Sequence, residues 1–446
     1  MKSSPNRALG ATAMTEGDAQ AWPARRLPAE WEPAGAVLLA WPRADGDWAP
    51  YLQDVRACYR RLLAALSALA PVLLLVDEPE QVLLELGPEL AALTRQPFSP
   101  SGSASANSPC ADRDAAQEPA PMAPPPPARA PASGALPAPR LRLLASPARD
   151  TWTRDYGPIT VLEHHPEHTT RAVATTTTRA PASTPVTARA GSRQERPLLL
   201  DFAFNGWGGK YASGGDDAAA AALHASGALG STPLRRLPLV LEGGSIESDG
   251  EGTLLTTSTC LLAPSRNPQL DRLALETELR HHLGAKRVLW LDQPALPGDD
   301  TDAHIDTLVR FCPNHTLVYV QGADGADPGD PWQGAGAGRD PLQQQLLALR
   351  TPEGKPYRLV PLPPGPSRQA PDDGRPLPTT YANALFLNGT VLMPVYGDPE
   401  RDAAAEAAWR RACPGWRILP LDCSALVLQH GSLHCATMQL PAALFR

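Results

Sequence analysis

The sequence predicts an α/β fold built from several similar modules. Two observations lead to this prediction. Short apolar runs of strand type alternate with stretches of helical periodicity, and a helix followed by a strand returns three times along the chain. The copies share no obvious sequence identity. An apolar content of 43% is ample for the core of a soluble enzyme.

The first copy of this helix and strand lies near the start of the chain. Tyr59, Leu62, Leu63 and Leu66 recur at the spacing of one helical face. The apolar run 72–76 follows and reads as a buried strand.

The second and third copies follow the same order. Residues 268–283 are expected to form a helix, with Pro268 at its start and Gly284 just past its end, and residues 288–291 a strand. The third copy and two further strands are expected at the following places: a helix at 403–411, and strands at 417–421, 254–257 and 391–394.

Low-complexity tracts interrupt these modules. The chain has 51 prolines, many of them in Pro/Ala/Ser/Thr-rich stretches without apolar periodicity, which we expect to be disordered insertions into surface loops. Lengthening a surface loop raises its closure entropy only logarithmically, so the modules tolerate such insertions. The tracts run at about 97–140, 164–197, 322–340 and 362–378. Residues 1–26 are expected to be a flexible N-terminus.

Charge and cysteine content limit the partners and the location. A net charge of −7 disfavours nucleic acid or an anionic membrane as a partner and suits a small cationic substrate. The chain has no apolar run near the length of a membrane span, and its first residues lack the apolar core of a signal peptide. Seven cysteines, an odd number without a CxxC pair, argue against a disulfide framework or structural zinc. We therefore expect a cytoplasmic protein with reduced thiols. The oligomeric state stays open, a homodimer included.

Chemistry-bearing residues gather in four short segments rich in glycine or proline. The last, GSLHC at 431–435, places Cys435 after a Gly-Ser turn, where a thiol can act as a nucleophile if its surroundings favour the thiolate. The alternative is a half-buried strand cysteine without a chemical role.

A second segment, GDDTDAHIDTLVRF at 298–311, holds a histidine and a carboxylate two residues apart. On an extended strand this spacing puts His304 and Asp306 on the same face, where they could serve as proton carrier and cation ligand. The same pair is also a common metal-ligand spacing. Further ligands would have to come from the poorly positioned histidines at 164, 165 and 168, which disfavours a metal site.

The remaining two segments each present a shielded acid. Asp155 lies between Trp152 and Tyr156, and Glu242 follows the apolar run 237–241 directly into a Gly-Gly turn. A shielded carboxylate needs a cationic partner, although surface acids without a role are common.

Taken in order, these segments resemble the agmatine deiminase and Porphyromonas-type peptidylarginine deiminase family, in the guanidine-modifying pentein superfamily. The resemblance runs from about residue 27 to 441 and rests on the following motifs: LPAEWEP and LAWP (27–42), RDYGP, FNGWGGKY (204–211), LEGGSIE, RNP (266–268), GDDTDAHID, YAN (381–383) and GSLHC. It implies a pentein α/β propeller of five ββαβ modules around a pseudo-fivefold axis, in one catalytic domain spanning 27–446. It also implies no metal or organic cofactor.

The resemblance also implies roles for the residues above. Cys435 would be the nucleophile and His304 the general acid and base. Asp155 and Asp306 would hold the guanidinium, and Glu242 would support both the substrate and the histidine. A guanidinium has five planar N–H donors, which carboxylates bind in bidentate fashion, so these assignments agree with the chemistry.

Four further residues on the family motifs have weaker assignments. Trp152 would pack against the substrate, with a core position as the alternative. Asn383 and Lys210 are expected to have a structural role in the central funnel of the propeller, where the resemblance places the site. For Arg154, a buried ion pair is an equally good interpretation. The family usually has glycine at the positions of Ala303 and His430.

The implied reaction is hydrolysis of a C–N bond in a linear amidine, with agmatine converted to N-carbamoylputrescine and ammonia. The departures at Ala303 and His430, and the WGGKY segment, leave the substrate less certain than the reaction type. Peptidylarginine is the second choice, and free arginine is disfavoured because no set of arginines for its carboxylate is evident. Two other classes of protein remain as alternatives. One is a non-catalytic pentein that binds a cationic ligand, and the other is a metal hydrolase that uses His304 and Asp306.

Overall fold

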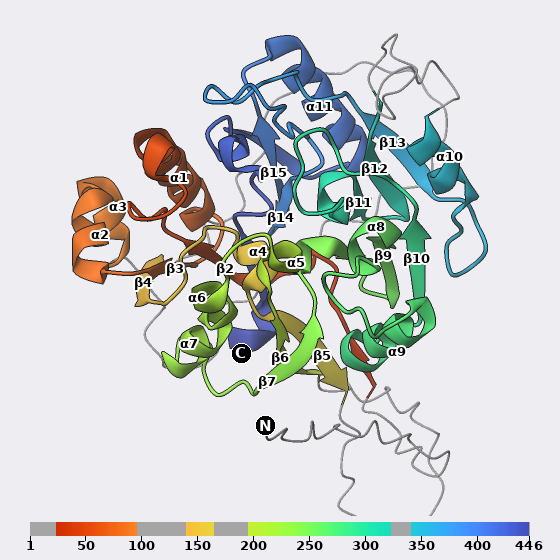
Figure 1. The fold of residues 1–446 in the computed structure, drawn as a ribbon, viewed down its shortest axis with the longest axis horizontal. Helices are drawn as coiled ribbons and strands as arrows, with labels where there is room; N and C mark the ends of the chain where they lie inside the picture. The colour runs from red at the N-terminus through yellow and green to blue at the C-terminus, as the bar shows by residue number, and fades with distance from the viewer. Residues whose placement is uncertain (1–23, 96–139, 165–194, 323–339, 446) are drawn as a thin grey trace, which may run out of the picture.

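The computed structural model describes residues 24–95, 140–164, 195–322 and 340–445. In these residues the chain forms five small mixed sheets, each with helices between its strands. Figure 1 shows α1, α7, α9, α10 and α11 at the periphery, with the strands inside them and the short α4 near the middle.

All five sheets share one order of pairing. A first strand runs antiparallel to a second, a helical connection follows, and a third strand then pairs parallel with the second. The repeated order confirms the expectation of several similar α/β modules.

The first sheet joins the two ends of the described chain, because β17 near the C-terminus pairs with β2 near the N-terminus. Its elements are β17 (Met438–Pro441), β2 (Ala34–Ala40), α1 (Leu52–Ser67), β3 (Val72–Val76), α2 (Pro79–Glu85), α3 (Pro88–Leu93) and β4 (Leu141–Ala145).

The second sheet also has four strands, since β1 pairs with β5. Its elements are β1 (Arg25–Arg26), β5 (Ile159–His164), β6 (Glu195–Ala203), α5 (Gly206–Gly209), α6 (Gly214–Asp217), α7 (Ala219–Ala225) and β7 (Leu234–Val240).

The other three sheets have three strands each. The third comprises β8 (Ile246–Ser248), β9 (Thr253–Thr257), α8 (Ser258–Leu261), α9 (Arg272–Leu283) and β10 (Arg287–Leu291). The fourth comprises β11 (Val309–Cys312), β12 (Thr316–Val320), α10 (Pro341–Ala348) and β13 (Arg358–Leu362). The fifth comprises β14 (Leu385–Leu387), β15 (Thr390–Val395), α11 (Pro399–Ala412) and β16 (Arg417–Asp422).

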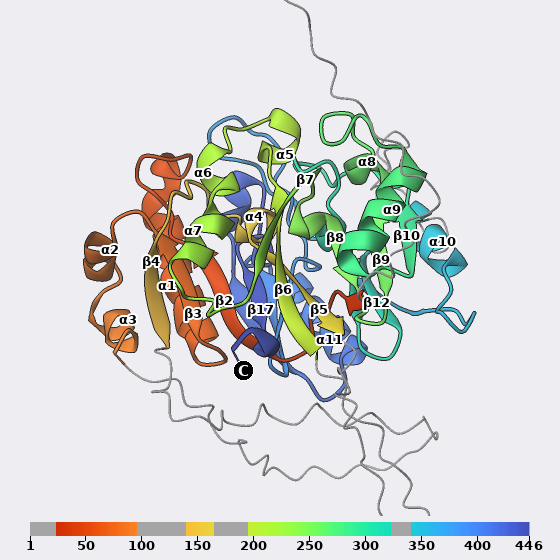
Figure 2. The same ribbon diagram turned by 90° about the horizontal axis from the view of Figure 1, so that it is seen from below.

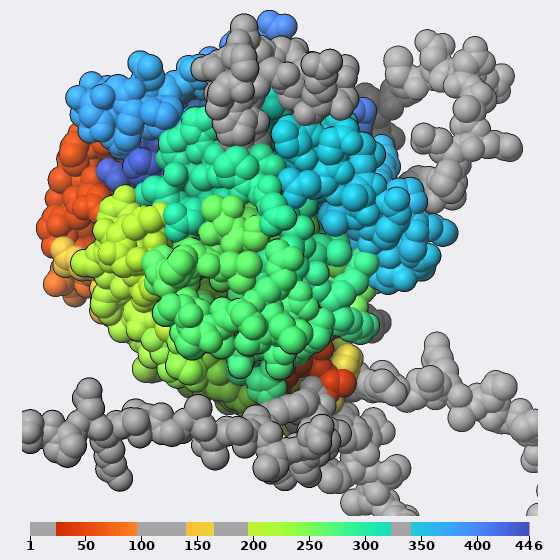
Figure 3. All heavy atoms as spheres, turned by 45° about the vertical axis from the view of Figure 1, so that its right-hand side comes forward, coloured from red at the N-terminus to blue at the C-terminus, as the bar shows by residue number. Residues whose placement is uncertain are grey.

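Short helical turns fill several connections. They are η1 (Ala49–Tyr51), α4 (Thr153–Tyr156), η2 (Gly243–Ser245), η3 (Ile305–Thr307), η4 (Leu426–Gln429) and η5 (Ala442–Phe445). In Figure 2, α5, α6 and α8 lie at one end of the sheets, shown at the top. The modules pack side by side into one continuous surface (Figure 3).

The sequence located the predicted helices and strands well, with one helix start misplaced. The helix expected from 268 begins only at Arg272, because the side chain of Asp271 accepts a hydrogen bond from Ala274 N at 2.8 Å and caps the helix there. Its other end is as expected: Gly284 adopts a left-handed φ of 72°. The helix predicted at 403–411 is confirmed and is longer, starting at Pro399 behind the N-cap Asp398.

Most of three predicted insertions, together with most of the predicted flexible N-terminus, lies outside the described residues. At their edges the prediction was too wide, since His164 belongs to β5 and residues 195–197 belong to β6. The fourth tract, 362–378, is described: it begins in β13, and its loop is closed by an Ala370 N–H bond to Arg375 O at 2.8 Å. Ala370 and Leu377 in this loop are buried, so its path is defined by contacts with the core.

Candidate active site

The connections between the sheets bring the predicted site residues together. Asp155 lies in α4, which follows β4, and Glu242 lies between the end of β7 and η2. His304 directly precedes η3, which contains Asp306, and Cys435 lies in a turn before β17. All five side chains are buried.

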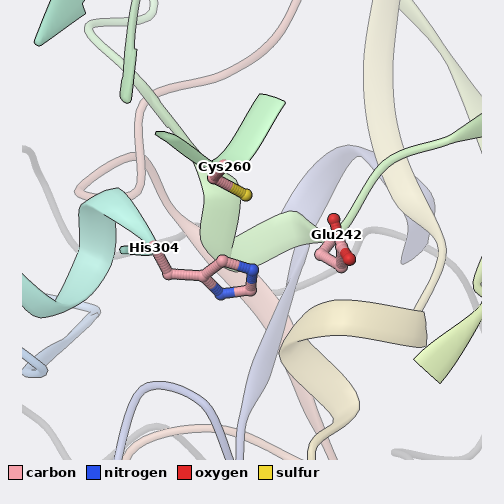
Figure 4. A group of neighbouring side chains, drawn as sticks. All are labelled: Glu242, Cys260 and His304. Carbon is pink, nitrogen blue, oxygen red and sulfur yellow. The ribbon is translucent and has the colours of Figure 1, made fainter. Parts of the chain in front are cut away.

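Short distances show that these residues share one site. His304 Nδ1 lies 3.6 Å from Asp155 Oδ1, and Cys435 Sγ lies 3.7 Å from Asp306 Oδ2. A backbone hydrogen bond of 3.1 Å from Arg154 N to Cys435 O ties α4 to the cysteine turn. Glu242 also faces the His304 ring, as does Cys260, and one ligand atom of each of these three residues lies within 4.8 Å of the other two (Figure 4).

The backbone of Gly244 lies against the side chains of His304, Asp155 and Asp306. A Cβ at this position would lie 2.7 Å from His304 Nδ1, 2.8 Å from Asp155 Oδ1 and 3.1 Å from Asp306 Oδ2. A side chain here would therefore push the three functional groups apart. The glycine N–H also donates a hydrogen bond of 3.0 Å to Asp155 Oδ1.

The prediction that His304 and Asp306 share one face of a strand is wrong. Asp306 lies in the 3-10 turn η3, and the residues before His304, Asp302 and Ala303, adopt left-handed φ angles of 65° and 66°. This reversal of the backbone, and not the alternation of a strand, brings both side chains into the site.

The Cys435 thiol is held by one side-chain donor. Asn383 Nδ2 donates to Sγ at 3.1 Å, while its Oδ1 accepts the backbone N–H groups of His434 at 2.9 Å and Cys435 at 3.3 Å. Burial, with Asp306 and Asp155 nearby, raises the pKa of Cys435 well above the ordinary thiol value. Without a bound cation, the thiol is therefore protonated at neutral pH. The alternative of a strand cysteine does not hold, since Cys435 precedes β17.

His304 is enclosed among acids and a second thiol. Burial alone would lower its pKa, but Asp155, Cys260 and Glu242 outweigh burial and raise the pKa well above the ordinary histidine value. Neither ring nitrogen makes a hydrogen bond of normal geometry within the described residues. The ring is thus kept charged by its acidic neighbours, among them Asp155, whose Oδ1 lies 3.6 Å from Nδ1.

The two aspartates differ in ionisation. Burial raises the pKa of Asp155 to about 6, against the opposing charge of His304. For Asp306, burial is outweighed by the close contact and charge of His434, whose Nδ1 lies 2.7 Å from Oδ2, and the pKa is lowered. Its other oxygen is buried without a hydrogen-bond partner.

Glu242 is fixed by an arginine that the sequence interpretation did not assign. Arg266 Nε donates to both carboxylate oxygens, at 2.9 and 3.0 Å, and both side chains are fully buried. Arg266 also donates to Asp302 Oδ2 at 2.7 Å, whose Oδ1 pairs with Lys210 Nζ at the same distance. Lys210 therefore supports the loop that carries His304.

Other residues at the site were also missed. Trp207 Nε1 donates to Asp155 Oδ2 at 2.9 Å, and His434 lies between Asp306 and Glu30. Both stand inside motifs quoted above, FNGWGGKY and GSLHC, but a tryptophan or histidine beside a motif glycine has no distinctive spacing. Arg154 pairs with Glu30 at 2.9 Å, which is the ion-pair alternative considered for it.

A pocket of about 390 Å³ opens onto Cys435. Trp152 forms part of its wall and packs against Gly431, where an added Cβ would lie 2.5 Å from the indole ring. None of the residues that line the pocket is lysine or arginine. Four of them are carboxylates: Asp47, Asp150, Asp155 and Asp300. Burial raises the pKa of Asp150 to about 8.

Two hydrogen bonds hold residues that line this pocket. Tyr211 Oη donates to Asp300 Oδ2 at 2.7 Å, and His430 Nδ1 lies 2.7 Å from Gly298 O. Cys435 is only 4% exposed at the bottom.

Among the residues that the structure describes, two groups of side chains have a composition able to hold a metal ion. They are Glu242 with Cys260 and His304, and Glu30 with Glu247 and His434. Of the histidines considered for a metal site with His304 and Asp306, His164 ends β5 and lies 3.8 Å from Glu195, while the other two lie outside the described residues.

The family model for Porphyromonas-type peptidyl-arginine deiminases matches residues 26–441. The chain belongs to this family. The resemblance inferred from the sequence motifs is therefore confirmed.

Relatives of this peptidyl-arginine deiminase family cover nearly the whole chain. A Stutzerimonas stutzeri protein named agmatine deiminase is 27% identical over 444 residues, which cover 94% of this chain and 96% of the relative. A Porphyromonas gingivalis crystal structure, provisionally named an arginine deiminase, is 36% identical, with a TM-score of 0.69 over 94% of this chain and 99% of that one.

The structure of a C. jejuni agmatine deiminase variant with substrate bound has a TM-score of 0.68, covers 93% of this chain and 96% of its own, and is 24% identical. This last likeness establishes a common fold. In the residues that the structure describes, no helix is long and apolar enough to cross a membrane.

Proposed function

We propose that this protein hydrolyses a small guanidine substrate, and that agmatine is converted to N-carbamoylputrescine and ammonia. The observation that carries the proposal is the pocket above Cys435, which is lined by four carboxylates and by no lysine or arginine. Such a pocket attracts a substrate with more than one positive charge.

The guanidinium would bind between Asp155 and Asp306. Within the described part of the chain, Asp155 has no lysine or arginine partner and one oxygen of Asp306 has no hydrogen bond, so both can accept the planar N–H donors of the substrate. The indole of Trp152 would pack against the substrate's flat cation or its methylenes. The outer carboxylates Asp150 and Asp300 would face the distal amine.

The bound cation would also activate the nucleophile. Burial and the charges of Asp306 and Asp155 raise the pKa of Cys435, so a guanidinium that neutralises both carboxylates would lower this pKa again, and the thiol would release its proton to water in the pocket. The thiolate would attack the central carbon, and the tetrahedral adduct would expel ammonia as His304 delivers its proton. The product of this step is a thiouronium on Cys435.

Hydrolysis of the thiouronium would use His304 in the opposite direction. Having lost its proton, the neutral ring would take one from a water molecule, and the water oxygen would displace the sulfur to give the ureido product. Glu242, fixed by Arg266, would hold the ring in place throughout.

The burial of the reacting thiol favours a small substrate over a peptide. Cys435 is only 4% exposed, and the pocket that opens onto it has a volume of about 390 Å³. The lining offers no lysine or arginine for the carboxylate of free arginine. Agmatine is the substrate that satisfies both conditions.

We also propose that residues 27–446 act as one catalytic domain of pentein type. The order of pairing that the five sheets share, and the pairing of β17 with β2, support a five-module propeller around a pseudo-fivefold axis. We also expect the protein to be cytoplasmic, and a homodimer is an assembly compatible with the proposal.

The substrate is tested by measuring ammonia and ureido product from agmatine, arginine and a blocked arginyl peptide in parallel, with chelator present. The proposal expects turnover of agmatine with little or none of the other two. Preferred turnover of the peptide would replace agmatine by peptidylarginine. A folded protein that turns over none of the three would contradict the proposed function and favour a binding role.

A further inference from the structure

Beside the proposed nucleophile lies a second thiol, which the mechanism above does not use. Cys260 is in α8, is fully buried, and faces the site together with His304 and Glu242 (Figure 4). One ligand atom from each of these three residues lies within 4.8 Å of the other two. A thiolate, an imidazole and a carboxylate form a typical donor set for Zn²⁺.

The histidine in this group is short of partners. His304 has no exposed surface, and neither of its ring nitrogens makes a normal hydrogen bond to the described residues. Figure 4 shows its ring directed between Cys260 and Glu242. A buried imidazole nitrogen without a partner is costly, and a metal ion would satisfy it.

The surrounding charge also suits a divalent ion. Asp155, Glu242 and Asp306 surround the ring, while Arg266 is the guanidinium paired with Glu242. Since each oxygen of a carboxylate has two lone pairs, Glu242 can keep the Arg266 bond and still bind a metal. The Cys260 thiol and the charged His304 ring would each give up one proton to the buffer as the metal–sulfur and metal–nitrogen bonds form.

We propose that Glu242, Cys260 and His304 form a binding site for Zn²⁺ and related divalent ions, and that an ion bound there inhibits the enzyme. Three protein ligands leave a fourth position for water. A metal-bound His304 can no longer deliver or accept a proton, so catalysis stops while the fold is kept. The ion acts as a reversible inhibitor and not as a cofactor.

The other metal-like group is a poorer candidate. Glu30, Glu247 and His434 have the right donor atoms, but Glu30 pairs with Arg154 and Arg310, and Glu247 also pairs with Arg310. A divalent ion placed there would face two guanidinium groups. The positive charge that this group needs is already supplied by the chain.

Cobalt binding tests the site without using activity. Co²⁺ added to the metal-free, full-length protein should give a thiolate-to-cobalt charge-transfer absorption in the wild type and in Cys435→Ala, but not in Cys260→Ser. The Cys435→Ala variant is the matched control, because it removes the other thiol of the site. A band that persists in Cys260→Ser, a band lost in Cys435→Ala, or no band in the wild type would overturn the proposal.

Zinc inhibition tests the consequence, and this part rests on the proposed function. Zn²⁺ should inhibit agmatine turnover by the wild type, and a chelator should restore it. In Cys260→Ser, half-inhibition should need at least about tenfold more Zn²⁺, since the loss of a ligand weakens metal binding by that order. Equal sensitivity of the two proteins would overturn the inhibitory role. If agmatine is not turned over at all, the proposed function fails, and the cobalt band still decides the metal site.

Discussion

Glu30 and Asp155 are two shielded carboxylates whose charges are balanced in different ways. Glu30 accepts from Arg154 at 2.9 Å and from Arg310, and these charges, with His434, outweigh burial and hold its pKa well below the ordinary value. Asp155 accepts only from the Gly244 and Trp207 N–H groups in the described residues, and burial raises its pKa to about 6.

The two pKa values differ because the two carboxylates have different hydrogen-bond and ion-pair partners, since both groups are largely shielded from water. Around Glu30 the chain supplies the cations itself, which makes that group part of the fold. Around Asp155 the chain leaves the cation out, and we infer that the substrate supplies it. The comparison predicts that changes on the Glu30 side act on stability and changes on the Asp155 side act on activity.

The largest expected effect is the loss of activity in Asp155→Asn. The amide keeps the shape but loses two charge-assisted hydrogen bonds to the guanidinium, each of about 1.5–3 kcal/mol, so kcat/KM for agmatine should fall by about a hundredfold to ten-thousandfold. Steady-state kinetics checks the loss, and thermal unfolding checks that the variant is no less stable. A variant that is less stable and still active would reverse the comparison.

On the Glu30 side, Arg310→Leu should reduce stability. Arg310 is fully buried and pairs with both Glu30 and Glu247, so its removal leaves buried charge unpaired and should cost about 3–5 kcal/mol in the free energy of unfolding. Arg410→Leu is the control, because Arg410 is exposed and its pair with Glu406 is worth under about 1 kcal/mol. Urea unfolding of both variants gives the comparison, and equal losses would contradict it.

The stability contributed by Asp155 should depend on pH. Its pKa rises from 3.8 to about 6 on folding, so the folded protein holds this proton more tightly than the unfolded chain does. The ionised carboxylate therefore destabilises the fold; the cost is absent below pH 3.8 and complete above pH about 6. At ~1.4 kcal/mol per pKa unit this cost is about 3 kcal/mol.

The measurement is the free energy of unfolding of the wild type and Asp155→Asn across this pH range. The variant should match the wild type near pH 4 and become more stable than it as the pH rises to 7. A difference independent of pH would show that Asp155 does not titrate in this range.

A smaller effect is expected at the outer carboxylates. Asp150→Asn should lower kcat/KM for agmatine by about tenfold, the order expected for one hydrogen bond to a charged group. N-butylguanidine, which is agmatine without the distal amine, is the matched substrate and should be turned over equally by both proteins. Equal losses for both substrates would mean that Asp150 positions the wall of the pocket instead of binding the amine.

The smallest effect concerns backbone strain, which also lies on the pocket side. Ala303 and His430 have left-handed φ angles of 66° and 67°, which favour glycine. Ala303→Gly should raise the free energy of unfolding by about 1 kcal/mol. His430→Gly should change it little, because the relief is offset by losing the contact of Nδ1 with Gly298 O. Destabilisation by Ala303→Gly would contradict this account of the loop.

Much of the fold could be predicted because its elements are local. The β3 strand and the helix before it follow directly from apolar spacing, and Gly284 ends α9 as a glycine past a helix should. The start of α9 was misplaced, because Pro268 and Asp271 both signal a helix start and only the structure shows which one caps it. The pairing of β17 with β2 joins the two ends of the chain, and no local pattern predicts it.

At the site, the motifs identified the residues but not how they meet. Cys435, His304, Asp155, Asp306 and Glu242 do come together, yet the route for His304 is a turn and not a strand. The family usually has glycine at the position of Ala303, and the structure gives this residue a left-handed φ of 66°. The contacts of Arg266 with Glu242 and of Cys260 with His304 join residues that are distant in sequence, so a single sequence does not reveal them. Asn383 was assigned a structural role, but its hydrogen bond to the Cys435 thiol was not predicted.

The central claim is that Cys435 forms a covalent thiouronium with agmatine, and it is tested most directly by acid quenching in the first turnover. Mass analysis of the proteolysed protein should find the peptide containing Cys435 heavier by agmatine less ammonia, and Cys435→Ala should neither form an adduct nor release ammonia. An unmodified Cys435 peptide at every quench time, together with normal ammonia release by Cys435→Ala, would contradict the account.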